Sequence, residues 1–391
     1  MRGPLLNRRW LSPVGLAVLA CAPDASTDPR GAGEPGAGVE SLAPEAAQFP
    51  IASSSNNDEL SYSVAFDGVG YLVGYMNVAV PSGNSTMKAR TVSAAGGLGA
   101  PISTGRIGYS PPFVAFDGTN YLMVWLDRTL ANPDVRGQFV STGGAKVGGI
   151  VKITTTHDVA ALTGLSFGGG QYLVTFSRLF AGMSRRFISP AGVVGSVRSL
   201  TTPPASSRSF SSLATDGTDF LAAWRGGPQG QSIVARLVRG NGSLGPPTTV
   251  DPGSANTFDF ITTTFAGGTY LVVWTDNGVY ARRVTAAGVA TGARIDVAGP
   301  PILNNGMVVA SGGNFAVELV EGSGTSRKIK LQLVDPAGAL LNGQKTLFSA
   351  SPTVTPTLGT LLANGSNFLL VNNRFTSVSS DVYGKFVTIT P

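Results

Sequence analysis

The chain has 391 residues, of which 42% are hydrophobic and only 13% are charged, and it contains 52 glycines. One compact core rarely holds so many residues, so a single domain of this length has to be a barrel, a propeller or a solenoid. The formal charge of +6 comes from 28 basic and 22 acidic residues, which are scattered along the chain. Because nucleic-acid-binding surfaces usually cluster basic residues among aromatics, we expect no nucleic-acid partner.

Residues 1–20 predict a secretion signal. They combine three arginines with an apolar run that ends just before Cys21, the only cysteine. Such a run is too short to span a bilayer as a mature helix and is typical of a cleaved export signal. It resembles a bacterial lipoprotein signal, and this resemblance implies that Cys21 carries the lipid. An ordinary export signal with an incidental cysteine is the alternative, because Leu19 stands where a small residue is usual.

Residues 21–45 predict a disordered tether. They are rich in Ala, Pro and Gly and nearly lack large apolar side chains, so they cannot bury enough surface to fold. Signal and tether together predict an exported protein of the cell envelope, at the outer membrane or cell surface, which meets the membrane only through the lipid on Cys21.

From residue 46 onward the sequence repeats a unit of about 50 residues, a period typical of propellers, solenoids and arrays. Aligning the copies on one aromatic residue gives Tyr71, Tyr121, Tyr172, Phe220, Tyr270, Phe315 and Phe368.

Each copy has the pattern of four short antiparallel strands. In "VAFDGTNYLMVW", residues 114–125, two strands flank a turn whose glycine can adopt a positive φ. Both faces of the second strand are apolar, which indicates a strand covered on both sides. A third strand and a short fourth strand follow, with no room for a helix. This unit predicts an all-β propeller blade.

The two ends of the repeat region complement each other. The seventh copy stops after its third strand, near Phe386, while residues 48–53 precede the first copy and look like an unpaired fourth strand. We therefore predict a seven-bladed β-propeller over residues 46–391, with four antiparallel strands per blade and an N-terminal strand that completes the last blade.

The repeat A-x-D-G-x-x-Y-L-V-V-W is similar to one found in uncharacterised bacterial surface lipoproteins built from propeller repeats. The likeness is greatest at Asp117–Trp125 and Ala266–Trp274, and it weakens where Leu319 and Asn372 replace the tryptophan. The resemblance implies a propeller fold and supplies no activity.

Groups suited to catalysis are scarce. His157 is the only histidine, whereas serine-hydrolase and zinc sites need His or His/Cys clusters. We therefore expect no catalysis, cofactor or metal. A carbohydrate-active hydrolase that uses carboxylates alone is the alternative, and the glutamates available to it are Glu59, Glu318 and Glu321. Glu318 occupies a second-strand position that should be buried. A structural envelope scaffold is the third hypothesis.

Two repeated polar positions have structural explanations. Aspartates open several of the tight turns, where they can accept local backbone hydrogen bonds, so calcium binding need not be invoked. The third strands carry long polar side chains, which we expect to pack between blades. These residues are Arg90, Gln138, Arg186, Arg236, Arg282, Gln332 and Lys385.

The two faces of the predicted disc differ. Turns from first to second and from third to fourth strand are short and uniform, and we call their side the tight-turn face. The remaining connections vary and form the loop-rich face. Variable loops on a rigid scaffold commonly bind ligands, so we expect a monomer that binds a protein or glycan there. The candidate contacts, chosen by position before each first strand, are Asn56, Asp58, Arg106, Tyr109, His157, Arg208, Phe258 and Asn304.

Overall fold

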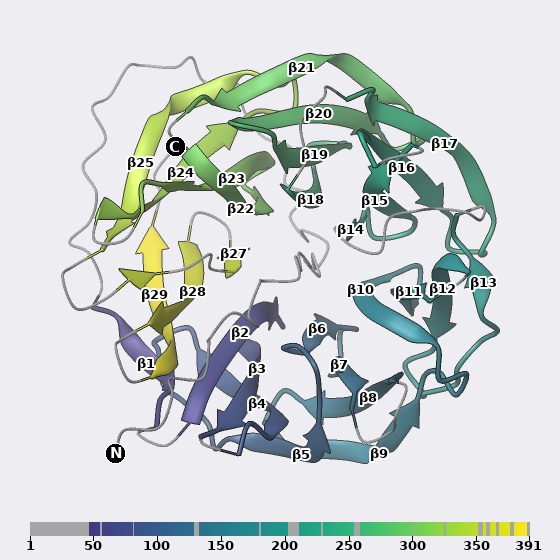
Figure 1. The fold of residues 1–391 in the computed structure, drawn as a ribbon, viewed down its shortest axis with the longest axis vertical. Coiled ribbons are helices and arrows are strands. Elements are labelled where there is room, and N and C mark those ends of the chain that lie inside the picture. Colours follow the sequence, from purple (N-terminus) through teal and green to yellow (C-terminus); the bar gives the residue numbers. More distant parts are fainter. Residues whose placement is uncertain are drawn as a thin grey trace, which may run out of the picture.

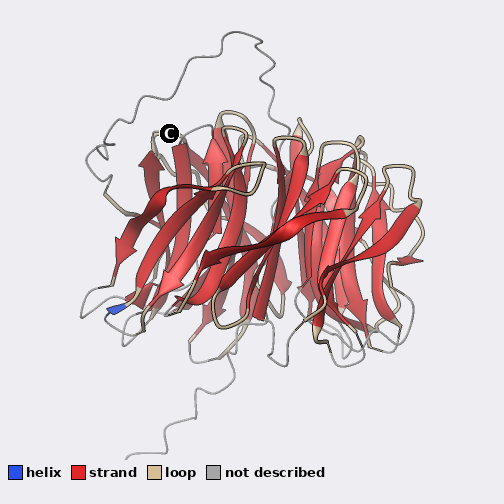
Figure 2. Cartoon of the chain, turned by 90° about the horizontal axis from the view of Figure 1, so that it is seen from above, coloured by secondary structure: helices blue, strands red, loops and turns tan. Residues whose placement is uncertain are grey.

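A computed structural model describes residues 47–388, apart from 55–56, 81, 129–132, 180, 202–210, 228–229, 254–258, 301, 324–325, 351–354, 357–359, 365–366 and 376–378. The expected signal, the tether and Cys21 lie outside the described residues. Seven antiparallel sheets stand around a central axis (Figure 1), which confirms the all-β, seven-bladed propeller. Seen from the side, the strands run between two faces that carry the turns and loops (Figure 2).

In blades 1 to 6 the strands follow one another in chain order, from the inner to the outer edge. Blades 1 to 3 consist of β2 (Asn57–Phe66), β3 (Gly70–Ala79), β4 (Ser85–Ser93) and β5 (Ile102–Ile107); β6 (Phe113–Phe116), β7 (Asn120–Asp127), β8 (Asp134–Ser141) and β9 (Lys146–Lys152); β10 (Val159–Gly168), β11 (Gln171–Arg178), β12 (Gly182–Ile188) and β13 (Arg198–Ser199). Blades 4 to 6 consist of β14 (Ser211–Thr215), β15 (Phe220–Gly226), β16 (Ser232–Val238) and β17 (Leu244–Asp251); β18 (Asp259–Ala266), β19 (Thr269–Thr275), β20 (Val279–Thr285) and β21 (Ala290–Ala298); β22 (Ile302–Ser311), β23 (Asn314–Glu321), β24 (Lys328–Val334) and β25 (Leu340–Ser349). Blade 7 contains β26 (Thr355–Pro356), β27 (Thr360–Asn364), β28 (Asn367–Phe375), β29 (Ser380–Thr388) and β1 (Phe49–Ala52).

The ring closes as predicted, because β1 pairs with β29 as the outer strand of blade 7 (Figure 1). Phe49 lies opposite Gly384 in this antiparallel pair. A Cβ atom on Gly384 would come within 2.6 Å of the Phe49 ring, so only glycine leaves space for that aromatic side chain. Phe49 also stacks on Phe386, with ring centroids 5.5 Å apart. The closure therefore combines backbone pairing with aromatic packing.

The second strands are buried on both faces, as their sequence indicates. On β7, Tyr121, Met123 and Trp125 pack in a cluster with blade 1, whereas Leu122 and Val124 pack in a cluster with blade 3. All five side chains have at most 1% of their surface exposed. Full burial of each large apolar side chain contributes about 1.5–3 kcal/mol. Packing against two neighbours therefore explains why the strand lacks apolar and polar alternation.

The Asp-Gly turns join neighbouring blades as well as reversing the chain. Asp117 Oδ1 accepts hydrogen bonds from Thr119 N at 2.8 Å and Asn120 N at 2.7 Å. Tyr172, on the second strand of the next blade, donates its hydroxyl to Asn120 O at 3.0 Å. Burial, followed by the nearby Asp117 carboxylate, raises the pKa of Tyr172 above its usual range. Turn and tyrosine therefore form one contact between blades.

This contact explains why the aligned aromatic is tyrosine in some copies and phenylalanine in others. Where the turn begins with Asp or Asn, the next blade supplies tyrosine; where it begins with Gly, Ala or Ser, the next blade supplies phenylalanine. The pairs are Asp67 with Tyr121, Asp117 with Tyr172, Gly168 with Phe220, Asp216 with Tyr270, Ala266 with Phe315, Ser311 with Phe368 and Asn364 with Tyr71. The repeated aspartates are thus accounted for by structure.

The long polar side chains of the third strands lie between blades, as expected. Arg90 is typical, since its Nε donates to Gly99 O in its own blade and its Nη1 donates to Ile51 O in the preceding blade. Gln138 and Gln332 are shorter and bond only within their own blades. The side chains that reach a carbonyl in, or directly after, the outer strand of the preceding blade are Arg90, Arg186, Arg236, Arg282 and Lys385.

Candidate functional site

The loop-rich face holds the described candidates Asp58, Tyr109 and His157, because strand direction brings the start of every first strand to that face. Arg106 lies exposed near the end of β5 and approaches the same face. Asn304 belongs to β22, but its side chain is not described. Three further candidates, Asn56, Arg208 and Phe258, lie outside the described residues.

Tyr109 presents an aromatic surface between blades 1 and 2. It is 47% exposed, and the guanidinium carbon of Arg128 lies 5.2 Å from its ring centroid. Backbone hydrogen bonds from Tyr109 N to Leu126 O and from Arg128 N to Ile107 O hold the two segments together. A cation over an aromatic ring stabilises both groups and keeps them in place. This pair can offer a ring for stacking and a charged donor.

His157 is held by a buried carboxylate between blades 2 and 3. Its Nδ1 donates to Asp134 Oδ2 at 2.8 Å, and its backbone N donates to Asp134 Oδ1 at 3.2 Å. Thr154 and Arg136 also donate to this fully buried carboxylate. The His157 side chain remains 51% exposed. In the neutral imidazole, a carboxylate on Nδ1 selects the tautomer that leaves Nε2 as an acceptor, so the neutral form of His157 can accept a hydrogen bond from a ligand.

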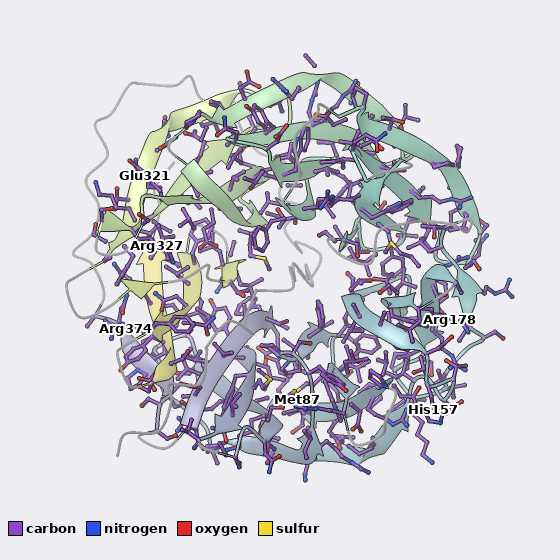
Figure 3. The ribbon with its side chains drawn as sticks, in the orientation of Figure 1. Met87, His157, Arg178, Glu321, Arg327 and Arg374 are labelled. Atoms are coloured by element: carbon purple, nitrogen blue, oxygen red, sulfur yellow. The ribbon has the colours of Figure 1, made fainter. Side chains whose placement is uncertain are left out.

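A second ion pair stands beside His157. Arg178 contacts Asp158 Oδ2, with Nη2 to Oδ2 at 2.6 Å and Nε to Oδ2 at 2.7 Å. Partial burial favours the neutral acid, but hydrogen bonds from Arg178 and Thr156 outweigh it and lower the pKa of Asp158. His157 and Arg178 lie close together toward the outer edge of the disc (Figure 3). His157 and the Asp158–Arg178 ion pair therefore lie away from the central axis.

The closure between blades 7 and 1 gathers three carboxylates at the loop-rich face. Glu59 Oε1 accepts from Asn77 Nδ2 at 2.8 Å and from Ser54 Oγ at 2.9 Å. Burial, reinforced by the charge of Asp381, raises the pKa of Glu59. Burial and the charge of Asp58 likewise raise the pKa of Asp381. Because Glu59 is only 3% exposed, a substrate has little access to its carboxylate.

The remaining glutamates do not extend this cluster. Glu318 is fully buried on β23, as expected, and its Oε2 accepts from Met307 N at 3.4 Å. Glu321 pairs with Lys330 on the neighbouring strand, and Figure 3 labels it on the same side of the disc as Arg327 and Arg374. Within the part of the chain that the structure describes, no three His, Cys, Asp or Glu side chains are arranged to hold a metal ion.

Exposed apolar side chains differ between the two faces. Both large aromatics among the exposed described residues, Tyr109 and Phe375, lie on the loop-rich face. Phe375 follows Arg374, whose guanidinium carbon lies 4.1 Å from the Tyr383 ring centroid. The loop-rich face also exposes Val80, whereas the large apolar side chains exposed on the tight-turn face are all aliphatic and include Val69, Val193, Val289 and Leu340. Aromatic and arginine side chains are enriched where proteins bind partners.

The tight-turn face also has a hollow, between blades 1 and 2. It has a volume of about 920 Å³, and its lining includes Tyr71, Thr91, Leu98, Phe116 and Thr142. Sequence reasoning did not anticipate it, because the turns around it are short and uniform. Sequence reasoning also missed Asp134 and Arg128. Comparing third-strand starts draws attention to Asp134, since the only other acidic residue at this position is Asp381 of the seventh copy.

No protein-family model and no curated protein matches the chain. Solved structures match its fold. The chain is similar to a puromycin hydrolase (TM-score 0.51, 16% identity, 87% of this chain and 56% of that one), so it spans only about half of that enzyme. It is also similar to a polysaccharide lyase (TM-score 0.53, 9% identity, 88% of this chain and 100% of that one). A third similar structure is the periplasmic gluconolactonase of Pseudomonas aeruginosa (TM-score 0.52, 14% identity, 74% of this chain and 86% of that one).

The structural similarity shows a shared fold, but sequence identities this low show no shared activity. The neighbours are enzymes, so the fold by itself is compatible with catalysis. The described part of the chain contains no helical segment with the length and apolar character needed to span a bilayer.

Proposed function

We propose that this protein is an exported, lipid-anchored propeller of the bacterial cell envelope that binds a glycan or protein through its loop-rich face, as a monomer and without catalysis. The observation that carries the proposal is the exposed Tyr109 with Arg128 over its ring. Aromatic rings stack on apolar faces of ligands while an arginine supplies directed hydrogen bonds. His157, fixed by buried Asp134, adds an acceptor on the same face.

The binding proposal predicts that Tyr109→Ala weakens the interaction at least about fivefold, the loss that corresponds to an interface residue worth more than about 1 kcal/mol. The measurement is a dissociation constant for the glycan or envelope protein selected by the unmodified chain on a glycan array or from envelope extracts. Val289→Ala is the matched control, since it removes an exposed side chain from the tight-turn face. Equal affinity for both variants would contradict the assignment.

The anchoring proposal is tested separately. The full chain is expected in the membrane fraction, and Cys21→Ser is expected in the soluble envelope fraction, because a protein held only by its lipid loses attachment with it. Labelling with a fatty-acid probe should disappear in the same variant. A membrane-bound, unlabelled Cys21→Ser protein would favour an ordinary export signal and another attachment.

A carbohydrate-active hydrolase is the second candidate. It is favoured by the raised pKa values of Glu59 and Asp381, because a carboxyl that stays protonated can act as a general acid. Two neighbours, the polysaccharide lyase and the gluconolactonase, bear names that refer to carbohydrate chemistry. The array-selected glycan distinguishes the two functions: a binder leaves it intact, whereas a hydrolase releases new reducing ends and loses this activity in Asp381→Asn, because Asp381 is only partly buried.

A further inference from the structure

Blade 3 departs from the repeat at two facing positions. The residue just before the long polar residue of the third strand is small or apolar in every other blade, namely Ala89, Gly137, Ala235, Ala281, Leu331 and Gly384. In blade 3 it is Arg185. Its partner on the outer strand is Arg198, where the other blades place Ile102, Val151, Thr248, Ile295, Lys345 and Phe49. Only blade 3 has a charge at both positions.

Arg185 is buried between blades 3 and 4. It is 3% exposed, and it donates through Nη1 to Ser199 O and through Nη2 to Gly242 O of blade 4, both at 2.6 Å. Its Nε has no hydrogen-bond partner among the described residues. Arg236 of blade 4 crosses the same boundary and donates through Nη1 to Leu200 O at 3.0 Å. These backbone carbonyls accept hydrogen bonds from Arg185 and Arg236, but they carry no negative charge to balance the two guanidinium groups.

Arg198 adds a third charge on the exposed side of this boundary. It belongs to β13, whose two residues make it the shortest outer strand. No described carboxylate forms an ion pair with Arg185, Arg198 or Arg236. Burial, followed by the charges of Arg198 and Arg236, lowers the pKa of Arg185. Facing like charges destabilise a sheet, and a buried charge without a counter-charge is costlier still.

Arg294 in blade 5 shows how this chain otherwise accommodates an arginine on an outer strand. Its Nε lies 3.2 Å from Asp296 Oδ1, and its guanidinium carbon lies 4.2 Å from the Tyr280 ring centroid. Arg185 and Arg198 of blade 3 have neither kind of partner among the described residues. Guanidinium groups match the oxygens of phosphate and sulfate in charge and geometry. An anion at this position would supply the missing counter-charge.

We propose that the outer boundary of blades 3 and 4 is an oxyanion-binding site for a sulfate or phosphate ester group. Arg198 makes the direct contact, while Arg185 and Arg236 supply the positive field behind it. The site lies on the rim of the disc, away from the loops discussed above. It therefore gives the propeller a second binding surface, suited to a sulfated glycan or to a phosphate-bearing envelope component.

The test is titration calorimetry of the full chain with inorganic sulfate and phosphate, at constant ionic strength with chloride as the reference anion. We expect saturable binding by the unmodified protein and a loss of about tenfold or more in Arg198→Ala, as for a charge-assisted contact. Arg294→Ala should bind normally. Absence of saturable binding, or an equal loss in Arg294→Ala, would overturn the proposal.

Arg185→Ala provides an independent readout, because alanine is the residue of blades 1, 4 and 5 at this position. It should weaken anion binding and raise the melting temperature in anion-free buffer by a few degrees, since an uncompensated charge is removed. A lower melting temperature would show that the arginine is structural and would count against the site. Competition by heparin against polyphosphate then identifies which ester the site prefers.

Discussion

Replacing Ile51 with Asp is expected to lower the free energy of unfolding by about 4 kcal/mol, a large effect for a single substitution. Ile51 is fully buried on β1, in a cluster with Tyr71 of blade 1 and Val382 of β29. The substitution removes roughly 2–3 kcal/mol of apolar burial. It also places a carboxylate without a partner in the closure, where β1 must either expel it or detach.

Two measurements separate detachment from a general loss of stability. Denaturant unfolding gives the change in free energy, and amide hydrogen exchange on β29 reports whether its pairing with β1 opens locally. Pro50→Asp is the matched control, because Pro50 is exposed on the same strand, and it should cost less than about 1 kcal/mol. If both variants unfold at the same denaturant concentration, β1 does not close the ring.

The fold could be predicted from sequence because its determinants are local and repeated. A positive-φ glycine in each tight turn that the structure describes, such as Gly118 at φ 94°, fixes where the chain reverses. The doubly apolar second strand fixes that each sheet is covered on both sides. The hydrogen bond between neighbouring blades also follows a sequence pattern, since an aspartate such as Asp117 at the start of a turn predicts a tyrosine rather than a phenylalanine in the next copy.

The candidate site was harder to predict, because function resides in departures from the repeat. Loop position alone selected His157, but it could not show that Asp134, 23 residues earlier in the chain, holds its backbone and ring. The repeated polar position of the third strands includes Arg186, which follows the repeat and donates to a carbonyl of blade 2. Its neighbour Arg185 breaks the repeat, and only a comparison of all seven copies at that position reveals it.

Asp134→Ala is the second substitution with a large expected effect. The carboxylate is fully buried and receives Thr154 Oγ1 at 2.8 Å, Arg136 Nη2 at 3.3 Å, and both donors of His157. Its removal leaves Arg136, whose side chain is 12% exposed, without its counter-charge. Breaking a buried charge network from one side typically costs about 3–5 kcal/mol, so we expect a loss in that range by denaturant unfolding.

The neighbouring pair of Asp158 and Arg178 supplies the contrast. Its side chains are 26% and 28% exposed, and solvent weakens such a pair, so Asp158→Ala should cost less than about 1 kcal/mol. Asp134→Asn should recover part of the loss, because its amide oxygen can still accept from Thr154 and from His157 N. If Asp134→Ala and Asp158→Ala prove equally mild, His157 is not positioned by a rigid network, and its place in the binding face loses its physical basis.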